Sequence, residues 1–234
     1  RARAYAEMVE NDKALADYDQ ALEVDPDCCG TYTGRAMVHG EMKEYEKALA
    51  DYDEALELKP DDANTYNSRG IAYRNLKQYD KALADYNRAV ELKPNNATSL
   101  NGLAWFLATC PDENYRNATR AVELAEQAIS LDPAAHNWNT LGVAYYRNGQ
   151  WEDACEALVK SIELQTGGSS SDFFFLAMAH HALGDRQKAN QWFKKAVDWM
   201  ETNAPADEEL LGVRQEAAER INGADSPKQP KPES

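Results

Sequence analysis

A segment of 34 residues recurs along this chain, and this repeat constrains the fold more than any other feature of the sequence. Near-identical stretches occupy residues 12–18, 46–52 and 80–86. A proline follows each stretch at the same distance, so that Pro60 and Pro94 are 34 residues apart. A chain that repeats one short unit folds as an array of stacked units, because each unit buries its apolar side against its neighbours.

The pattern inside residues 63–96 predicts two helices. Tyr66 and Tyr73 lie at helical spacing in the first half, and Ala82 and Tyr86 begin a second apolar stripe. The proline near the end of the repeat stops the second helix, because proline has no N–H and disfavours helical backbone in the residue before it. Each repeat is therefore expected to be a tight antiparallel helix hairpin.

The residues of this hairpin resemble the tetratricopeptide repeat (TPR) family, whose pattern is W-x2-L-G-x2-Y, then A-x3-F, then P. Trp138, Leu141, Gly142 and Tyr145 match the first part of the pattern, and Ala154 begins the second part. The resemblance implies an all-α fold, namely a right-handed α-solenoid of antiparallel helix hairpins, or TPR superhelix. It also implies that the first helices of successive repeats line a concave groove.

We expect five complete repeats, with a partial repeat before them and a capping helix and a tail after them. The partial repeat is residues 1–28, because Arg1 already corresponds to the seventh position of a repeat. The complete repeats are 29–62, 63–96, 97–134 with a five-residue insertion, 135–169 and 170–203, followed by a capping helix at 206–221 and a disordered tail at 223–234. The truncated first repeat and the absence of a starting Met indicate a piece of a longer protein.

The second half also resembles the C-terminal TPR regions of multidomain bacterial proteins, including some Ser/Thr protein kinases. The residues that carry this narrower resemblance are 103–112, 115–117, 138–145 and 173–180. The resemblance implies a companion domain upstream of Arg1 in the same polypeptide.

Two repeat positions change together along the chain. The seventh position is Arg in the first three units and Leu in the last three, while the twenty-third position changes from Asp to an apolar residue. Because the seventh position faces the partner helix, an Arg there needs a carboxylate for its guanidinium. We predict Arg–Asp pairs in residues 1–96 and apolar contacts in the rest; the alternative is that each Arg points to solvent. The residues are Arg1, Arg35 and Arg69 with Asp17, Asp51 and Asp85, then Leu103, Leu141 and Leu176 with Leu124, Ala157 and Trp192.

Composition excludes several classes of partner. The formal net charge of −15 repels phosphate backbones and anionic headgroups, so neither nucleic acid nor a membrane surface is expected as a partner. The sequence contains no apolar run near the roughly 18 residues that span a bilayer. The four cysteines include no C-x-x-C motif, and we expect reduced thiols and a cytoplasmic location.

The groove residues are predicted from positions 2, 5, 9 and 12 of the first helices, which share one helix face. Asn67, Asn101 and Asn139 all occupy the fifth position, where their amides can both donate to and accept from an extended peptide. Beside them, Trp105, Tyr146, Phe174 and Met178 offer apolar sockets, and Asn64, Arg74, His136 and His181 complete the predicted peptide-binding groove. The alternative is that the Asn side chains cap or fill, and that the aromatic rings pack on the neighbouring repeat.

The chain shows no pattern of residues typical of catalysis, and we expect no enzyme activity, cofactor or metal. It lacks H-E-x-x-H, P-loop and G-x-S-x-G motifs. Acidic clusters such as residues 51–54 are interpreted as solvated helix faces. In the insertion, Tyr115 and Arg116 either contact a ligand or belong to a packed loop. The complete repeats carry no Lys or Arg at positions 2, 5 and 6 of their first helices, which disfavours recognition of an acidic C-terminal carboxylate.

These observations favour a protein-protein interaction scaffold that binds an extended peptide or a helix of a protein partner in its concave groove. Two other functions stay open at this point. One is a recruitment or regulatory module of a larger bacterial enzyme, such as a Ser/Thr kinase. The other is self-assembly through the exposed N-terminal repeat, whose missing half leaves apolar surface uncovered.

Overall fold

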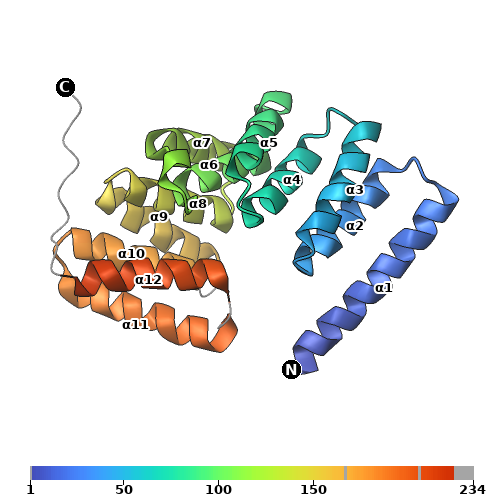
Figure 1. The fold of residues 1–234 in the computed structure, drawn as a ribbon. Coiled ribbons are helices and arrows are strands. Elements are labelled where there is room, and N and C mark those ends of the chain that lie inside the picture. The colour runs from blue at the N-terminus through green and yellow to red at the C-terminus, as the bar shows by residue number, and fades with distance from the viewer. Residues whose placement is uncertain (1, 166–167, 205–206, 224–234) are drawn as a thin grey trace. The chain divides into compact units, whose positions relative to one another are not determined.

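The computed structural model describes residues 2–165, 168–204 and 207–223, and these residues form helices joined by short turns (Figure 1). Two compact units are present: an N-terminal unit of residues 1–103 and a C-terminal unit of residues 104–234. The N-terminal unit contains α1 (Ala2–Val24), α2 (Cys29–Glu41), α3 (Tyr45–Leu58), α4 (Ala63–Asn75) and α5 (Tyr79–Leu92), and α6 (Ala97–Thr109) crosses the boundary. The C-terminal unit continues with the 3-10 turn η1 (Glu113–Tyr115), α7 (Ala118–Leu131), α8 (Ala135–Arg147), α9 (Trp151–Leu164), α10 (Ser170–Ala182), α11 (Arg186–Asn203) and α12 (Glu208–Asn222). The tail expected at 223–234 lies, apart from residue 223, outside the described residues.

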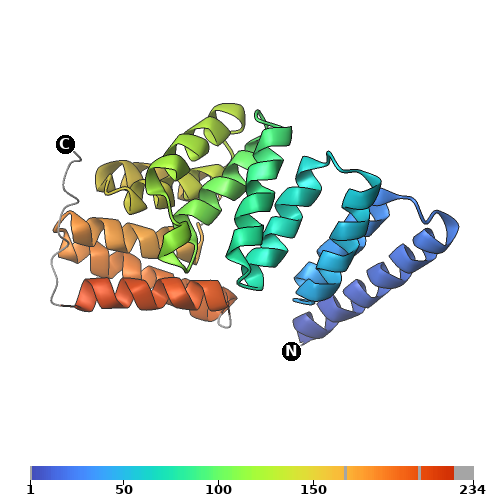
Figure 2. The same cartoon turned by 45° about the horizontal axis from the view of Figure 1, so that its top comes forward.

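Successive helices pair as antiparallel hairpins, which confirms the expected all-α solenoid of helix hairpins. Figures 1 and 2 show α2 beside α3 and α4 beside α5, and the same pairing joins α8 to α9 and α10 to α11. The right-handed coil of the array stays a prediction.

The turn inside each hairpin depends on one residue with left-handed backbone. Lys43 and Lys77 take φ angles of 61° and 58° at the fifteenth repeat position, and Gly149 and Gly184 take 79° and 83° at the same position. Positive φ is uncommon for residues with a side chain and easy for glycine, so this position sets the point where the first helix ends.

Helix α1 departs from the expected partial repeat, because it runs from Ala2 to Val24 without a turn. The residue at its fifteenth repeat position is Val9, and a β-branched residue strongly disfavours positive φ. The first-helix residues of this partial repeat therefore continue directly into the second helix.

The predicted Arg–Asp pairs are confirmed in the N-terminal unit. Arg69 donates from Nε and Nη2 to the two carboxylate oxygens of Asp85, at 2.7 and 2.8 Å. Arg35 makes the same bidentate contact with Asp51, at 2.9 and 2.6 Å. Both Asp residues are buried, which makes these pairs part of the hairpin core. The third expected pair involves Arg1, which lies outside the described residues.

A third hydrogen bond joins each arginine to the preceding repeat. Arg69 Nη1 donates to Asp53 at 2.7 Å, and Arg35 Nη1 donates to Asp19 at 2.6 Å. The interpretation of residues 51–54 as merely a solvated face is therefore wrong, because Asp51 is buried against Arg35 and Asp53 links two repeats.

The apolar residues predicted to replace the Arg–Asp pairs in the second half lie in the core at the same repeat positions. Leu103, Leu141 and Leu176 are buried, as are Leu124 and Ala157 at the twenty-third position. Trp192 is partly exposed and stacks on Phe173, with ring centroids 5.6 Å apart.

The insertion between α6 and α7 is a packed loop. The amide of Asn117 donates to the Leu107 carbonyl at 3.0 Å, and Arg116 Nε donates to the Cys110 carbonyl at 2.6 Å. The Tyr115 ring meets Phe106 edge to face at 6.3 Å. Of the two interpretations of Tyr115 and Arg116, the structure supports the packed loop.

Candidate protein-binding surface

The first-helix face, meaning positions 2, 5, 9 and 12 of the first helices, is exposed at positions 2 and 9 in the N-terminal unit. At position 9, Met37 on α2 is 52% exposed and Ile71 on α4 is 46% exposed. Asn64, about two helix turns before Ile71, is also exposed, and Arg74 is partly exposed. Two large apolar side chains thus repeat at the same place on adjacent first helices.

The same position is closed in the C-terminal unit. Val143 on α8 is 0% exposed and Met178 on α10 is 1% exposed. Helix α12 packs against α10 and α11, and Ala217 on α12 is fully buried (Figure 1).

An ion pair fastens α12 to α8 across 69 residues of sequence. Glu216 accepts two hydrogen bonds from the Arg147 guanidinium, at 2.5 and 2.7 Å. Burial raises the pKa of Glu216, but the hydrogen bonds from Arg147 outweigh burial and hold that pKa below its usual value. Arg220 on α12 lies over the Tyr146 ring at 5.8 Å. Helix α12 therefore covers the end of the first-helix face of this unit, in addition to closing the last repeat.

The expected sockets at Tyr146, Phe174 and Met178 are wrong, because these side chains are buried. Tyr146 packs edge to face on Phe175 at 5.5 Å, and burial raises its pKa to about 12. Phe174 packs edge to face on Phe193 at 5.7 Å. The sequence placed these residues on the correct helix face, but it did not reveal what covers that face. Trp105, on α6, remains partly exposed.

The asparagines at the fifth position contact the next repeat. Asn139 Nδ2 donates to Asp172 Oδ1 at 2.7 Å, and Asp172 is the buried partner of Ser169 in the capping box of α10. Asn67 is buried, and a Cβ at Gly102 would collide with its amide oxygen. The amide of Asn139 therefore joins two repeats, which agrees with the alternative that the Asn side chains cap or fill.

Asn101 and the two histidines complete the predicted set. Asn101 is partly exposed on α6, and its Oδ1 is buried without a hydrogen-bond partner among the described residues. His136 is exposed, whereas His181 is partly exposed and burial lowers its pKa.

One surface residue escaped the sequence prediction. Met37 lies in repeat 29–62, whereas the predicted groove residues all belong to the repeats from residue 63 onward. The signal was present, since Met37 stands 34 residues before Ile71 at the same repeat position.

Other kinds of site find no support in the described residues. No cluster of three or more His, Cys, Asp or Glu side chains there could hold a metal ion. Among the helices of the described ranges, none has the length and apolar character needed to cross a bilayer. The four cysteines are free in this structure.

Family models recognise the repeats along the chain. Models described as tetratricopeptide repeat match residues 63–96, 135–167, 1–28 and 173–203, and a model described as TPR repeat matches residues 38–77. Together these matches span more than half of the sequence. A search of curated proteins found no match.

Solved structures with similar folds share little sequence with the chain. YrrB, described as a TPR protein with an unusual peptide-binding site, is 21% identical, with a TM-score of 0.57 over 85% of this chain and 97% of YrrB. The type IV pilus biogenesis factor PilW is 24% identical, with a TM-score of 0.67 over 84% of this chain and 87% of PilW. The APC/C hetero-tetramer Cut9–Hcn1 is 17% identical, with a TM-score of 0.74 over 90% of this chain and 40% of the matched chain. At these identities the likeness establishes the fold.

Proposed function

The chain belongs to the tetratricopeptide repeat family, and on that premise we propose that it is a non-catalytic scaffold that binds a partner protein on the first-helix face of its N-terminal unit. The observation that carries the proposal is the contrast at repeat position 9. Met37 and Ile71 are about half exposed, whereas Val143 and Met178 are buried in the unit that contains α12. Large apolar side chains that repeat on an exposed face are typical of interaction surfaces.

The proposed ligand is an amphipathic helix of the partner. In the C-terminal unit the corresponding face is partly covered by a helix, α12, which presents a buried alanine and charged residues that pair with its edge. A helix with apolar residues at i, i+3 and i+4 would cover Met37 and Ile71 in the same manner. Asn64, Arg74 and Asn101 are the residues of the predicted groove that belong to this unit and would contact such a ligand. An extended peptide is the second form of ligand that we consider for this surface.

The test is a charge placed in the apolar row. Met37→Glu with Ile71→Glu should abolish capture of the partner. Replacing an anchor residue of an interface weakens binding by about 2 kcal/mol or more, which is about 30-fold in affinity. Leu58→Glu is the matched control, since Leu58 is 40% exposed in the same unit but belongs to a second helix. Partners are compared by affinity capture and mass spectrometry with the wild type and both variants. A partner that is retained by the double variant as well as by the control contradicts the proposal.

The two other functions have their own tests. A module that serves an enzyme in cis requires a catalytic domain in the reading frame upstream of Arg1, and sequencing that region decides it. Self-assembly requires that the scattering mass rise with concentration.

A further inference from the structure

The C-terminal unit has an open pocket of about 460 Å³ between α7, α8 and α9, away from the first-helix face. Trp138, Leu141 and Tyr145 from α8 contribute its rings and part of its apolar lining. Its other lining residues are Glu126 and Ile129 from α7, with Asp153, Glu156, Ala157 and Lys160 from α9. Three carboxylates and one ammonium group thus surround two aromatic rings.

In the N-terminal unit the equivalent place is filled by an arginine of the chain itself. The Arg69 guanidinium lies over the rings of Tyr66 and Tyr73, with distances to the centroids of 5.4 and 5.7 Å. Lys81 lies over the Tyr73 ring at 5.2 Å, and Asp53 accepts from Arg69. This site combines aromatic faces, carboxylates and a cation, which attract one another electrostatically.

The pocket keeps the aromatic rings and the carboxylate of that site but has no cation at the repeat positions of Arg69 and Lys81. By repeat position, Trp138 and Tyr145 replace Tyr66 and Tyr73, and Glu126 replaces Asp53. Leu141 stands where Arg69 would be, which removes the guanidinium.

The charges contributed by α9 have changed in the same sense. Asp153 stands at the position of Lys81, so a cation is replaced by a carboxylate. Ala157 stands at the position of Asp85, while Glu156 adds a carboxylate one residue earlier. The pocket therefore has a surplus of negative charge, and among the described residues no Arg or Lys lies over the Trp138 and Tyr145 rings.

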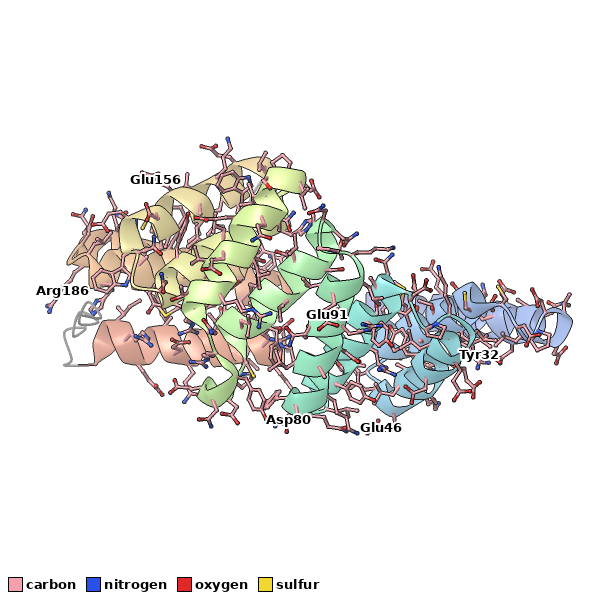
Figure 3. All side chains as sticks on the ribbon, turned by 90° about the horizontal axis from the view of Figure 1, so that it is seen from above. Tyr32, Glu46, Asp80, Glu91, Glu156 and Arg186 are labelled. Carbon is pink, nitrogen blue, oxygen red and sulfur yellow. The ribbon has the colours of Figure 1, made fainter. Side chains whose placement is uncertain are left out.

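The other repeats indicate what such a ring binds. Four complete repeats carry an aromatic residue at the fourth position, namely Tyr32, Tyr66, Trp138 and Phe173. Within the described residues, Arg35, Arg69 and Lys195 lie over Tyr32, Tyr66 and Phe173, at 5.7, 5.4 and 4.3 Å, and Trp138 is the exception. Tyr32 and the exposed Glu156 are labelled in Figure 3.

Lys160 is the one cation of the pocket lining, and its ammonium group has another partner. It stands at the repeat position of Lys195, but its Nζ bonds to Glu163 at 3.3 Å. Tyr145 in turn donates its hydroxyl proton to Glu126 at 2.8 Å, which holds this carboxylate beside the rings.

We propose that this pocket binds the guanidinium of an arginine side chain supplied by a partner protein, in the place that Arg69 occupies in its own repeat. The inference rests on the proposed scaffold function, but it uses a different surface from Met37 and Ile71. A planar guanidinium suits the site because it stacks on aromatic faces and pairs with carboxylates at once. The net charge of −15 favours the approach of such a basic segment.

The test uses N-acetyl-arginine-methylamide as the probe, titrated into the ¹⁵N-labelled protein. We expect the indole N–H signal of Trp138 to shift with a dissociation constant in the millimolar range, as befits a single side chain. The citrulline analogue has the same shape without the charge, and it should bind at least about five-fold more weakly. Equal shifts with both probes would overturn the proposal.

Three variants locate the binding. Glu126→Gln with Glu156→Gln should weaken the arginine probe at least about five-fold, whereas Glu123→Gln, an exposed residue of α7 outside the pocket, should leave it unchanged. Leu141→Arg with Ala157→Asp restores the internal pair, and it should abolish probe binding because the pocket is then filled. If Leu141→Arg with Ala157→Asp fails to fold, the comparison of Glu126→Gln with Glu156→Gln against the control decides. Unchanged probe binding in the Glu126→Gln, Glu156→Gln variant refutes the site. Since the probe is a small molecule, its binding is independent of whether a partner occupies Met37 and Ile71.

Discussion

The two units build the same helix hairpin with opposite chemistry at its centre. In the N-terminal unit, Arg69 reaches Asp85 and Asp53 and covers two tyrosine rings. In the C-terminal unit, Leu141 and Ala157 pack at the equivalent positions and leave an open pocket beside Trp138. The hairpin therefore tolerates either core, and the residues at positions 7 and 23 decide whether its outer side is filled.

The first-helix face shows the reverse contrast. It is uncovered at Met37 and Ile71 in the N-terminal unit, and it is closed at Val143 and Met178 in the C-terminal unit. The exposed apolar side chains of the N-terminal unit and the pocket of the C-terminal unit thus belong to different sides of the hairpin.

The largest expected effect comes from breaking the buried ion pair. Asp85→Ala should lower the free energy of unfolding by about 3–5 kcal/mol, because it leaves the Arg69 guanidinium without its bidentate partner. The side chains of Asp85 and Arg69 are 8% and 19% exposed, so water replaces the lost contact only in part. Urea denaturation followed by circular dichroism measures the change.

The control for this prediction converts the hairpin to the chemistry of the other unit. Arg69→Leu with Asp85→Leu should recover most of the lost stability, as apolar replacements of buried pairs often do. Equal midpoints for the single and the double variant would show that the pair is not what stabilises the hairpin.

A smaller effect on stability is expected from breaking the Arg147–Glu216 ion pair, which joins α12 to α8. Glu216→Ala should cost about 1.5–3 kcal/mol of local stability, since it removes two charge-assisted hydrogen bonds to the largely buried Arg147. Hydrogen exchange of the α12 amides reports the loss. Glu219→Ala, an exposed residue of the same helix, is the control, and equal exchange in both variants would contradict the role of the ion pair.

The same contact predicts a pH dependence. The pKa of Glu216 lies below its usual value in the folded protein, where Arg147, Arg220 and Arg116 face it. Its contribution to docking is therefore complete above the ordinary carboxylate pKa of about 4.5, and it decreases as the pH falls through the lowered value. The protection factors of the α12 amides, taken against the intrinsic exchange rate at each pH, should fall over that acidic range in the wild type and less in Glu216→Gln.

The hairpin contact at the eighth position should also differ between the units. A Cβ at Gly142 would lie 2.5 Å from Leu158 Cγ, whereas at Gly70 it would lie 3.2 Å from the nearest atom of the Tyr86 ring. Gly142→Ala should cost about 1–3 kcal/mol, because the core must shift to admit the methyl group. Gly70→Ala should cost less, and thermal melting of the two variants compares them. The reverse order would mean that the tyrosine packs more rigidly than the leucine.

The smallest effect is expected from the bond between repeats. Asp53→Ala should cost less than about 1 kcal/mol, because the Asp53 side chain is 54% exposed and water can replace it on Arg69. Urea denaturation of this variant beside Asp85→Ala separates the exposed carboxylate from the buried one on the same guanidinium. A loss as large as that of Asp85→Ala would show that the exposed bond also holds the array together.

Local patterns predicted much of this structure. The joint change of positions 7 and 23 predicted the pairs of Arg35 and Arg69, because a hairpin fixes which two positions meet. The hydrogen bond from each arginine to the preceding repeat was not predicted, although the sequence contained a signal for it. Position 25 is Asp (Asp19, Asp53) where the next repeat has Arg at position 7, and it is Asn87 where the next repeat has Leu103. The turn was decided by single residues, since Lys and Gly accept positive φ where Val9 does not.

The helix hairpins, their spacing and the chemistry at their centres follow from the sequence alone, because these depend on contacts between residues within one repeat or its neighbour. Which surfaces remain open depends on the tertiary structure. Helix α12 reaches Arg147 from 69 residues away and covers a face whose residues alone look exposed, and the outer pocket opens because side chains from three helices leave a space that no single repeat contains.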